Sequence, residues 1–183
     1  MPPVHDLVLL GIGLILTVGT GFFVASEFSL VNLDRSDLEL RRSKGERNLG
    51  LTIGALKRTS THLSSAQLGI TLTTLLAGYT LEPSISSFLR PSLTTLGLPE
   101  TAVTITGSVL AVIIATLLSM IVGELVPKNF ALALPRHTAK VVIPFQVAFT
   151  WLFRPAVVGL NETANGILRA IGIEPKEELS SAR

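Results

Sequence analysis

The sequence predicts an all-α integral membrane protein with three transmembrane helices and further cytoplasmic juxtamembrane or re-entrant helices. Hydrophobic residues make up 48% of the 183 residues and charged residues only 15%, against about 25% charged in soluble domains. Residues 7–26, 59–81 and 101–123 contain no Asp, Glu, Lys or Arg. Each stretch is long enough to cross the roughly 30 Å hydrocarbon core as a helix. This pattern excludes a nucleic-acid-binding module, and the absence of Cys excludes thiolate metal sites.

The predicted spans cover residues 7–32, 59–81 and 101–126. A cleaved signal peptide is the alternative for the first, but no Lys or Arg precedes it and it exceeds the usual 7–15-residue apolar core. The second is rich in Ser, Thr and Gly, which suits a helix packed inside a bundle. Pro144 and Pro155 interrupt a fourth stretch, so we expect a re-entrant or interfacial juxtamembrane segment at 137–170. Residues 1–172 then form one transmembrane domain, and 173–183 form a linker toward a further domain.

The distribution of Lys and Arg predicts the orientation. Seven lie between the first two spans, whereas Arg90 is the only one between the second and third. Positive residues favour the cytoplasmic side, so we expect an outside N-terminus and a cytoplasmic C-terminus in a multi-pass plasma membrane protein. The first cytoplasmic loop should form two short surface helices, with Asp34 or Ser36 capping the first.

Glu124 is the strongest candidate for chemistry, because an ionisable residue inside a span is costly and marks a functional site by default. Pro127 has no N–H, so the carbonyl of Gly123 loses its helical donor directly beside this carboxylate. Interrupted helices with released carbonyls coordinate cations in transporters, and oxygen ligands suit Mg²⁺ or Na⁺. The alternative is a helix that simply ends at Pro127.

Hydroxyl groups on the first two spans could complete a cation site. Ser26 and Ser29 share one face of the first span, while Thr71 and Thr74 belong to a polar heptad pattern in the second. Close helix packing explains that pattern equally well. Glu27 is also an ionisable residue in a span, and an interfacial position is its alternative interpretation. No nucleophile and base are arranged as in a catalytic site, so we do not expect an enzyme.

Three segments carry a family resemblance, namely FFVASEFSL (22–30), AQLGITL (66–72) and GELVPK (123–128). Together they resemble the transmembrane (DUF21) domain of the CorC/CNNM, or HlyC/CorC, family of magnesium transporters. The resemblance implies a homodimer, Mg²⁺ export driven by Na⁺ entry, and a cytosolic CBS-domain pair that binds ATP. By motif, Ser26, Ser29 and Glu124 match the family's ion ligands. Ile70 stands where many members carry Asn, so either Thr71 or Thr74 replaces it, or the ion differs, or Mg²⁺ is bound weakly.

The leading hypothesis is therefore a Mg²⁺ exporter with an inward-facing pocket. We expect its ion ligands to be Ser26, Ser29, Thr71, Thr74, Gly123 and Glu124. The alternative is a membrane-embedded ion sensor or regulatory scaffold that binds an ion without net transport.

Overall fold

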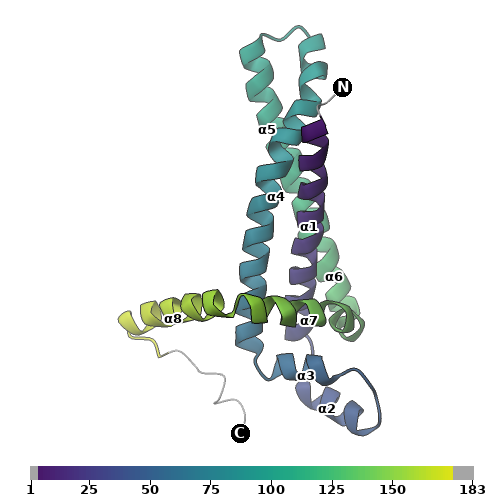
Figure 1. The fold of residues 1–183 in the computed structure, drawn as a ribbon, viewed down its shortest axis with the longest axis vertical. Coiled ribbons are helices and arrows are strands. Elements are labelled where there is room, and N and C mark those ends of the chain that lie inside the picture. The colour runs from purple at the N-terminus through teal and green to yellow at the C-terminus, as the bar shows by residue number, and fades with distance from the viewer. Residues whose placement is uncertain (1–3, 175–183) are drawn as a thin grey trace. The chain divides into compact units, whose positions relative to one another are not determined.

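The computed structural model describes residues 4–174, and helices are the only regular elements in that range (Figure 1). The predicted all-α class is confirmed. In chain order the helices are α1 (Val4–Val31), α2 (Arg35–Ser43), α3 (Gly50–Leu56), α4 (Thr59–Thr95), α5 (Glu100–Leu118), a π-helical segment (Ser119–Leu125), α6 (Val126–Ala133), α7 (Pro135–Leu152) and α8 (Arg154–Ala170).

The chain divides into two compact units, and each is described by itself. The first unit comprises Met1–Phe22 with Ile70–Lys128, and the second comprises Phe23–Gly69 with Asn129–Arg183. Both α1 and α4 contribute residues to each unit. Of the predicted linker 173–183, only residues 173 and 174 lie within the described part of the chain.

Two of the described helices are long and apolar enough to cross a membrane. They are Val4–Val31 and the continuous helix Glu100–Ala133, and the bent pair α7–α8 makes a third if it forms a single span. These two correspond to the predicted first and third spans. At 37 residues α4 is also long enough, but its many hydroxyl residues lower its hydropathy. The assignment of α4 as a crossing stays a prediction.

In the first unit, α4 and α5 run antiparallel and are joined by a short turn containing Gly97, whose φ is 76° (Figure 1). Ala77 and Leu81 of α4 pack with Ala115 of α5 in a buried apolar cluster. Small residues also let α1 approach α4, because a Cβ at Gly13 would lie 2.6 Å from the Leu81 side chain.

The helix α4 extends 14 residues beyond the predicted end of the second span, through Pro83 and Pro91. Hydroxyl groups around these prolines bond to backbone carbonyls. Ser84 donates to the Thr80 carbonyl at 2.7 Å, and Thr94 donates to the Arg90 carbonyl at 2.9 Å. Neither bond goes to a carbonyl that a proline deprives of its donor, which is that of Tyr79 for Pro83 and that of Ser87 for Pro91. The helix α4 therefore continues although both prolines interrupt its backbone ladder.

In the second unit, the short helices predicted for the first loop are present as α2 and α3. Asp34 caps α2, its carboxylate accepting a 3.1 Å hydrogen bond from the Asp37 N–H. Leu38 of α2 packs with Ile53 of α3, and Ala55 of α3 packs with Ile143 of α7. The side chains of α3 therefore connect the first cytoplasmic loop of the prediction to α7.

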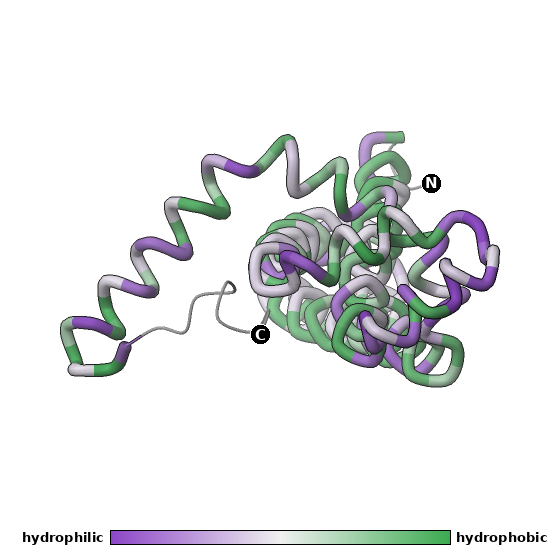
Figure 2. The backbone as a smooth tube through the Cα atoms, turned by 90° about the horizontal axis from the view of Figure 1, so that it is seen from below, coloured by the Kyte–Doolittle hydropathy of each residue, from purple (hydrophilic) through white to green (hydrophobic). Residues whose placement is uncertain are grey.

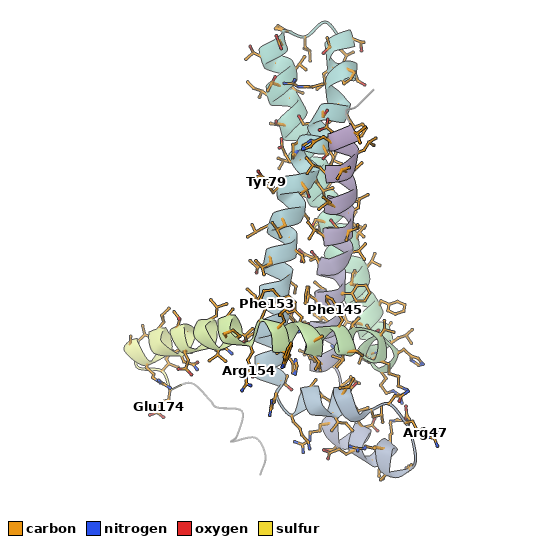
Figure 3. The ribbon with its side chains drawn as sticks, in the orientation of Figure 1. Arg47, Tyr79, Phe145, Phe153, Arg154 and Glu174 are labelled. Atoms are coloured by element: carbon orange, nitrogen blue, oxygen red, sulfur yellow. The ribbon has the colours of Figure 1, made fainter. Side chains whose placement is uncertain are left out.

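The predicted proline-interrupted segment forms α7 and α8, which are bent by 78°. The bend lies at Phe153, and Arg154 begins α8 directly after it (Figure 3). Hydrophobic and hydrophilic residues alternate along α8 (Figure 2). Only Val157 of this 17-residue helix is buried. Such an amphipathic helix is typical of an interfacial segment.

Aromatic rings join α1 to α7 within the second unit. The Phe23 ring lies 5.3 Å from that of Phe145 and 4.6 Å from that of Phe149, measured between centroids. Gly69 of α4 gives this ring its space, because a Cβ there would lie 2.6 Å from the ring.

We therefore expect Gly69→Ala to lower the free energy of unfolding by about 1–2 kcal/mol, because the Phe23 ring is confined by its aromatic neighbours. Thermal unfolding in detergent measures the change. Gly78→Ala is the matched control on the same helix, since nothing lies within 4 Å of its added Cβ. Equal stability of the two variants would contradict the close packing at Gly69.

Candidate functional site

The π-helical segment Ser119–Leu125 interrupts the third predicted span without ending it. The Val126 N–H donates to the carbonyl of Ile121, five residues back. Pro127 cannot donate, so the carbonyl of Gly123 lacks its α-helical donor and that of Val122 its π-helical donor. The sequence predicted that the helix would be interrupted here. The structure places the interruption in a wider turn, after which α6 begins with Pro127 in its first turn, where proline is tolerated.

This wider turn brings Ser119 and Glu124 into the wall of one cavity. In a regular α-helix, residues five apart point about 140° away from each other, whereas a π-helix pairs residues i and i+5. The cavity has a volume of about 270 Å³ and lies entirely in the first unit. Its walls come from α4, from α5 and from the π-helical segment, and include Thr74, Gly78, Thr116, Ser119 and Glu124.

Two hydroxyl groups in this cavity lack hydrogen-bond partners among the described residues. They are Thr74 Oγ1 and Ser119 Oγ, both of which are buried. Serine and threonine in helices usually donate to a carbonyl of the preceding turn, as Thr17 does to Gly13 at 2.9 Å. A buried hydroxyl without a partner costs free energy, so these oxygens are available to a ligand.

Gly123 is buried against α1 and does not line the cavity. A Cβ at Gly123 would lie 3.3 Å from the Thr17 carbonyl oxygen and 3.5 Å from Thr20 Cβ. In return, a Cβ at Gly21 would lie 2.8 Å from Pro127 Cγ and 3.4 Å from the Val122 carbonyl oxygen. Mutual glycine packing thus seats the released carbonyls against α1, while the Glu124 side chain lines the cavity.

The remaining predicted ligands occupy different positions. Ser26 and Ser29 belong to the second unit, where both are fully buried and neither hydroxyl has a partner among the described residues. Thr71 is exposed and is not part of the cavity wall. Within the first unit, the structure therefore brings Thr74 and Glu124 together.

A buried polar cluster in the second unit was not predicted. The Thr150 hydroxyl donates to Ser65 Oγ at 2.9 Å and lies 3.1 Å from His62 Nδ1. Gln146 Nε2 donates to the His62 carbonyl at 3.1 Å. The partners are more than 80 residues apart in sequence, so no local pattern could have revealed the cluster. It ties α4 to α7.

Ser119 and Thr116 are the cavity residues that sequence reasoning missed. The signal for Ser119 is its spacing of five residues from Glu124, and this spacing has meaning only once the π-helical turn is known. In residues 4–174, no group of three or more His, Asp or Glu side chains is placed to hold a metal ion. An ion in this cavity would be bound by one carboxylate and neutral oxygens, a set suited to a hard cation.

Because the Ser119 hydroxyl has no hydrogen-bond partner within residues 4–174, Ser119→Ala should leave the stability unchanged or raise it by about 1 kcal/mol. Thr20→Val is the contrasting variant, because Thr20 donates to Thr73 Oγ1 at 2.7 Å across α1 and α4. Its loss should lower the stability by about 1 kcal/mol. Unfolding in detergent compares the two, and an equal loss for Ser119→Ala would show that its hydroxyl has a structural role.

Comparison with known proteins finds bacterial relatives that match nearly the whole chain. It is 46% identical over 170 residues to the UPF0053 protein MT1890 of Mycobacterium tuberculosis, covering 93% of this chain and 37% of the relative. It is 32% identical over 179 residues to the UPF0053 protein YhdT of Bacillus subtilis, covering 97% of this chain and 38% of the relative. The chain thus spans well under half the length of these relatives.

The model of one protein family, described as the cyclin M transmembrane N-terminal domain, matches residues 11–182. This match begins four residues inside the first predicted span and covers the rest of it, the other two predicted spans, the π-helical segment and the cavity. It confirms the family that the three sequence segments indicated. The chain therefore belongs to the cyclin M transmembrane domain family and is related to the UPF0053 proteins.

Proposed function

We propose that this domain exports Mg²⁺ from the cell in exchange for Na⁺, as a homodimer in the plasma membrane. One observation carries the proposal. Glu124, Thr74 and Ser119 line a single cavity in helices of a membrane domain, and the Thr74 and Ser119 hydroxyls have no hydrogen-bond partner among the described residues. The proposed orientation places the N-terminus outside and the C-terminus in the cytoplasm, so that the cavity opens inward.

The chemistry of Mg²⁺ supports this assignment of the cavity. The ion prefers six oxygen ligands, loses its waters reluctantly, and is usually held by one or two carboxylates together with water. Glu124 supplies the single negative charge, and the hydroxyls of Thr74, Thr116 and Ser119 supply neutral oxygens. A volume of about 270 Å³ leaves room for several retained waters.

Weak, partly hydrated binding favours transport over storage, because an ion must also leave its site. One carboxylate only half neutralises a divalent cation, and the remaining ligands are uncharged. Exchange with Na⁺, which also takes oxygen ligands, is compatible with such a site. Thr74 then provides the side-chain oxygen that Ile70 cannot.

The other predicted ligands keep their proposed roles on separate grounds. Ser26 and Ser29 each bury a hydroxyl that has no partner among the described residues, and we assign both to ion binding. Thr71 and the Gly123 carbonyl remain proposed ligands from sequence. In the longer proteins of this family, a cytosolic CBS-domain pair that binds ATP is the proposed regulatory partner.

Mg²⁺ flux into dye-loaded proteoliposomes tests the proposal. Glu124→Gln keeps the size of the side chain but removes its charge. We expect this variant to reduce flux by at least about tenfold, the minimum effect typical of disturbing the surroundings of a metal site. Ser119→Ala should reduce flux while the protein stays as stable as the parent. Glu82→Gln is the matched control, because Glu82 lies on α4 outside the cavity.

Full flux by Glu124→Gln would contradict the proposed site. Binding of Mg²⁺ without any flux across sealed vesicles would instead support the sensor or scaffold alternative. Coupling to Na⁺ is tested separately by imposing a Na⁺ gradient. If the Mg²⁺ flux does not change with this gradient, Na⁺ coupling is rejected, whereas Mg²⁺ transport is not.

A further inference from the structure

A second cavity lies in the second unit between α3 and α7. Its volume is about 460 Å³, and it involves none of the residues assigned to ion transport. Lys140 of α7, Thr52 of α3 and Asn48 of the preceding loop contribute polar groups to its wall. The lining thus presents an ammonium, a hydroxyl and a carboxamide, which are groups that bind phosphate oxygens.

The rest of the wall is apolar, with Leu51 on α3 and Pro144 on α7 as its larger members. Leu51 is exposed. A ligand that filled this cavity would therefore meet polar groups at one part of the wall and an exposed aliphatic side chain at another. That combination matches an amphiphile better than a free, fully hydrated anion.

Charge around the cavity favours an anionic ligand. Residues 34–58 carry seven Lys and Arg against four Asp and Glu, and Arg47 extends from the loop between α2 and α3 (Figure 3). A cluster of this kind beside a membrane span attracts anionic lipids, at about 1 kcal/mol per basic residue. The predicted position of α2 and α3 directly after the first span places the cluster at the membrane surface.

Lys140 already has a partner, the carboxylate of Glu46, at 3.0 Å. The hydrogen bond from Lys140 lowers the pKa of Glu46, and the charges of Lys140, Arg41 and Arg136 lower it further. Glu46 therefore keeps two nearby cations if Lys140 turns to another anion. The Glu46–Lys140 pair is exposed at the surface, and pairs of this kind are weak enough to be exchanged.

Pro144 adds an acceptor in the same turn of α7. It has no N–H, so the carbonyl of Lys140, four residues earlier, lacks its helical donor. A headgroup that combines a phosphate with hydroxyl donors, as in phosphatidylglycerol, offers partners both for the Lys140 ammonium and for this carbonyl.

We propose that the cavity between α3 and α7 binds the headgroup of an anionic phospholipid, with the Lys140 ammonium pairing with its phosphate. Asn48 and Thr52 donate hydrogen bonds to the phosphate oxygens, and Leu51 contacts the beginning of an acyl chain. The site is independent of Mg²⁺ transport, and its failure would leave the proposed function untouched.

Titration of the purified 183-residue chain with phosphatidylglycerol, followed by native mass spectrometry, tests the proposal. Phosphatidylcholine with the same acyl chains is the comparison lipid, and we expect tighter binding of phosphatidylglycerol. Lys140→Gln should weaken that binding about fivefold. Lys57→Gln is the matched control, because it removes the same charge from the same region but does not line the cavity.

Glu46→Gln should act in the opposite direction and tighten binding, because it frees Lys140 from its competing partner. This variant keeps the proposal testable even if Lys140→Gln misfolds. Equal losses of phosphatidylglycerol affinity for Lys140→Gln and Lys57→Gln would show that binding depends on diffuse surface charge, and would overturn the proposal. Displacement of the lipid by inorganic phosphate alone would overturn it in favour of a free phosphate site.

Discussion

The absence of one N–H group, that of Pro127, governs the architecture of the proposed ion site. A helix loses a backbone hydrogen bond at a proline, and here it widens into a π-helical segment directly before that residue. The change of register turns Glu124 and Ser119 toward one cavity. It also leaves carbonyls that Gly21 and Gly123 accommodate by letting α1 come close. Backbone chemistry at a single residue thus decides which side chains share a wall.

Much of the fold could be predicted from the sequence, because charge-free stretches and proline positions act over short distances. The first and third spans, the capping role of Asp34 and the break before Pro155 all follow from such local rules. The length of α4 did not, because an interior proline usually ends or kinks a helix, whereas α4 continues through both Pro83 and Pro91.

The chemical character of the candidate site could be predicted from the sequence more fully than the set of residues that form it. Glu124 and Thr74 could be selected because a carboxylate or a hydroxyl pattern inside a span is conspicuous. Ser119 could not, because its alignment with Glu124 depends on a helical register that sequence spacing alone does not give. The cluster around Gln146 and Thr150 depends on contacts between distant segments and was equally hidden.

Hydroxyl groups serve two opposed purposes in this chain. Thr17, Thr20 and Ser84 use theirs to bond carbonyls or one another, so they contribute to helix packing. Four other hydroxyls are buried without a partner in the described part of the chain, which lowers stability; they belong to Ser26, Ser29, Thr74 and Ser119. The presence or absence of a hydrogen-bond partner thus separates the structural hydroxyls of the spans from those assigned to ion binding, although both sets consist of Ser and Thr.

Because α8 begins at the bend at Phe153, any change in the bend angle moves the far end of this helix. Seventeen residues span about 26 Å, so a rotation of about 10° at the bend moves the far end by about 4 Å. A chain of ring contacts connects the bend to α1, in the order Phe153, Phe149 and Phe23. A small change in the angle at Phe153 therefore displaces the far end of α8 much further than it displaces the residues beside the bend.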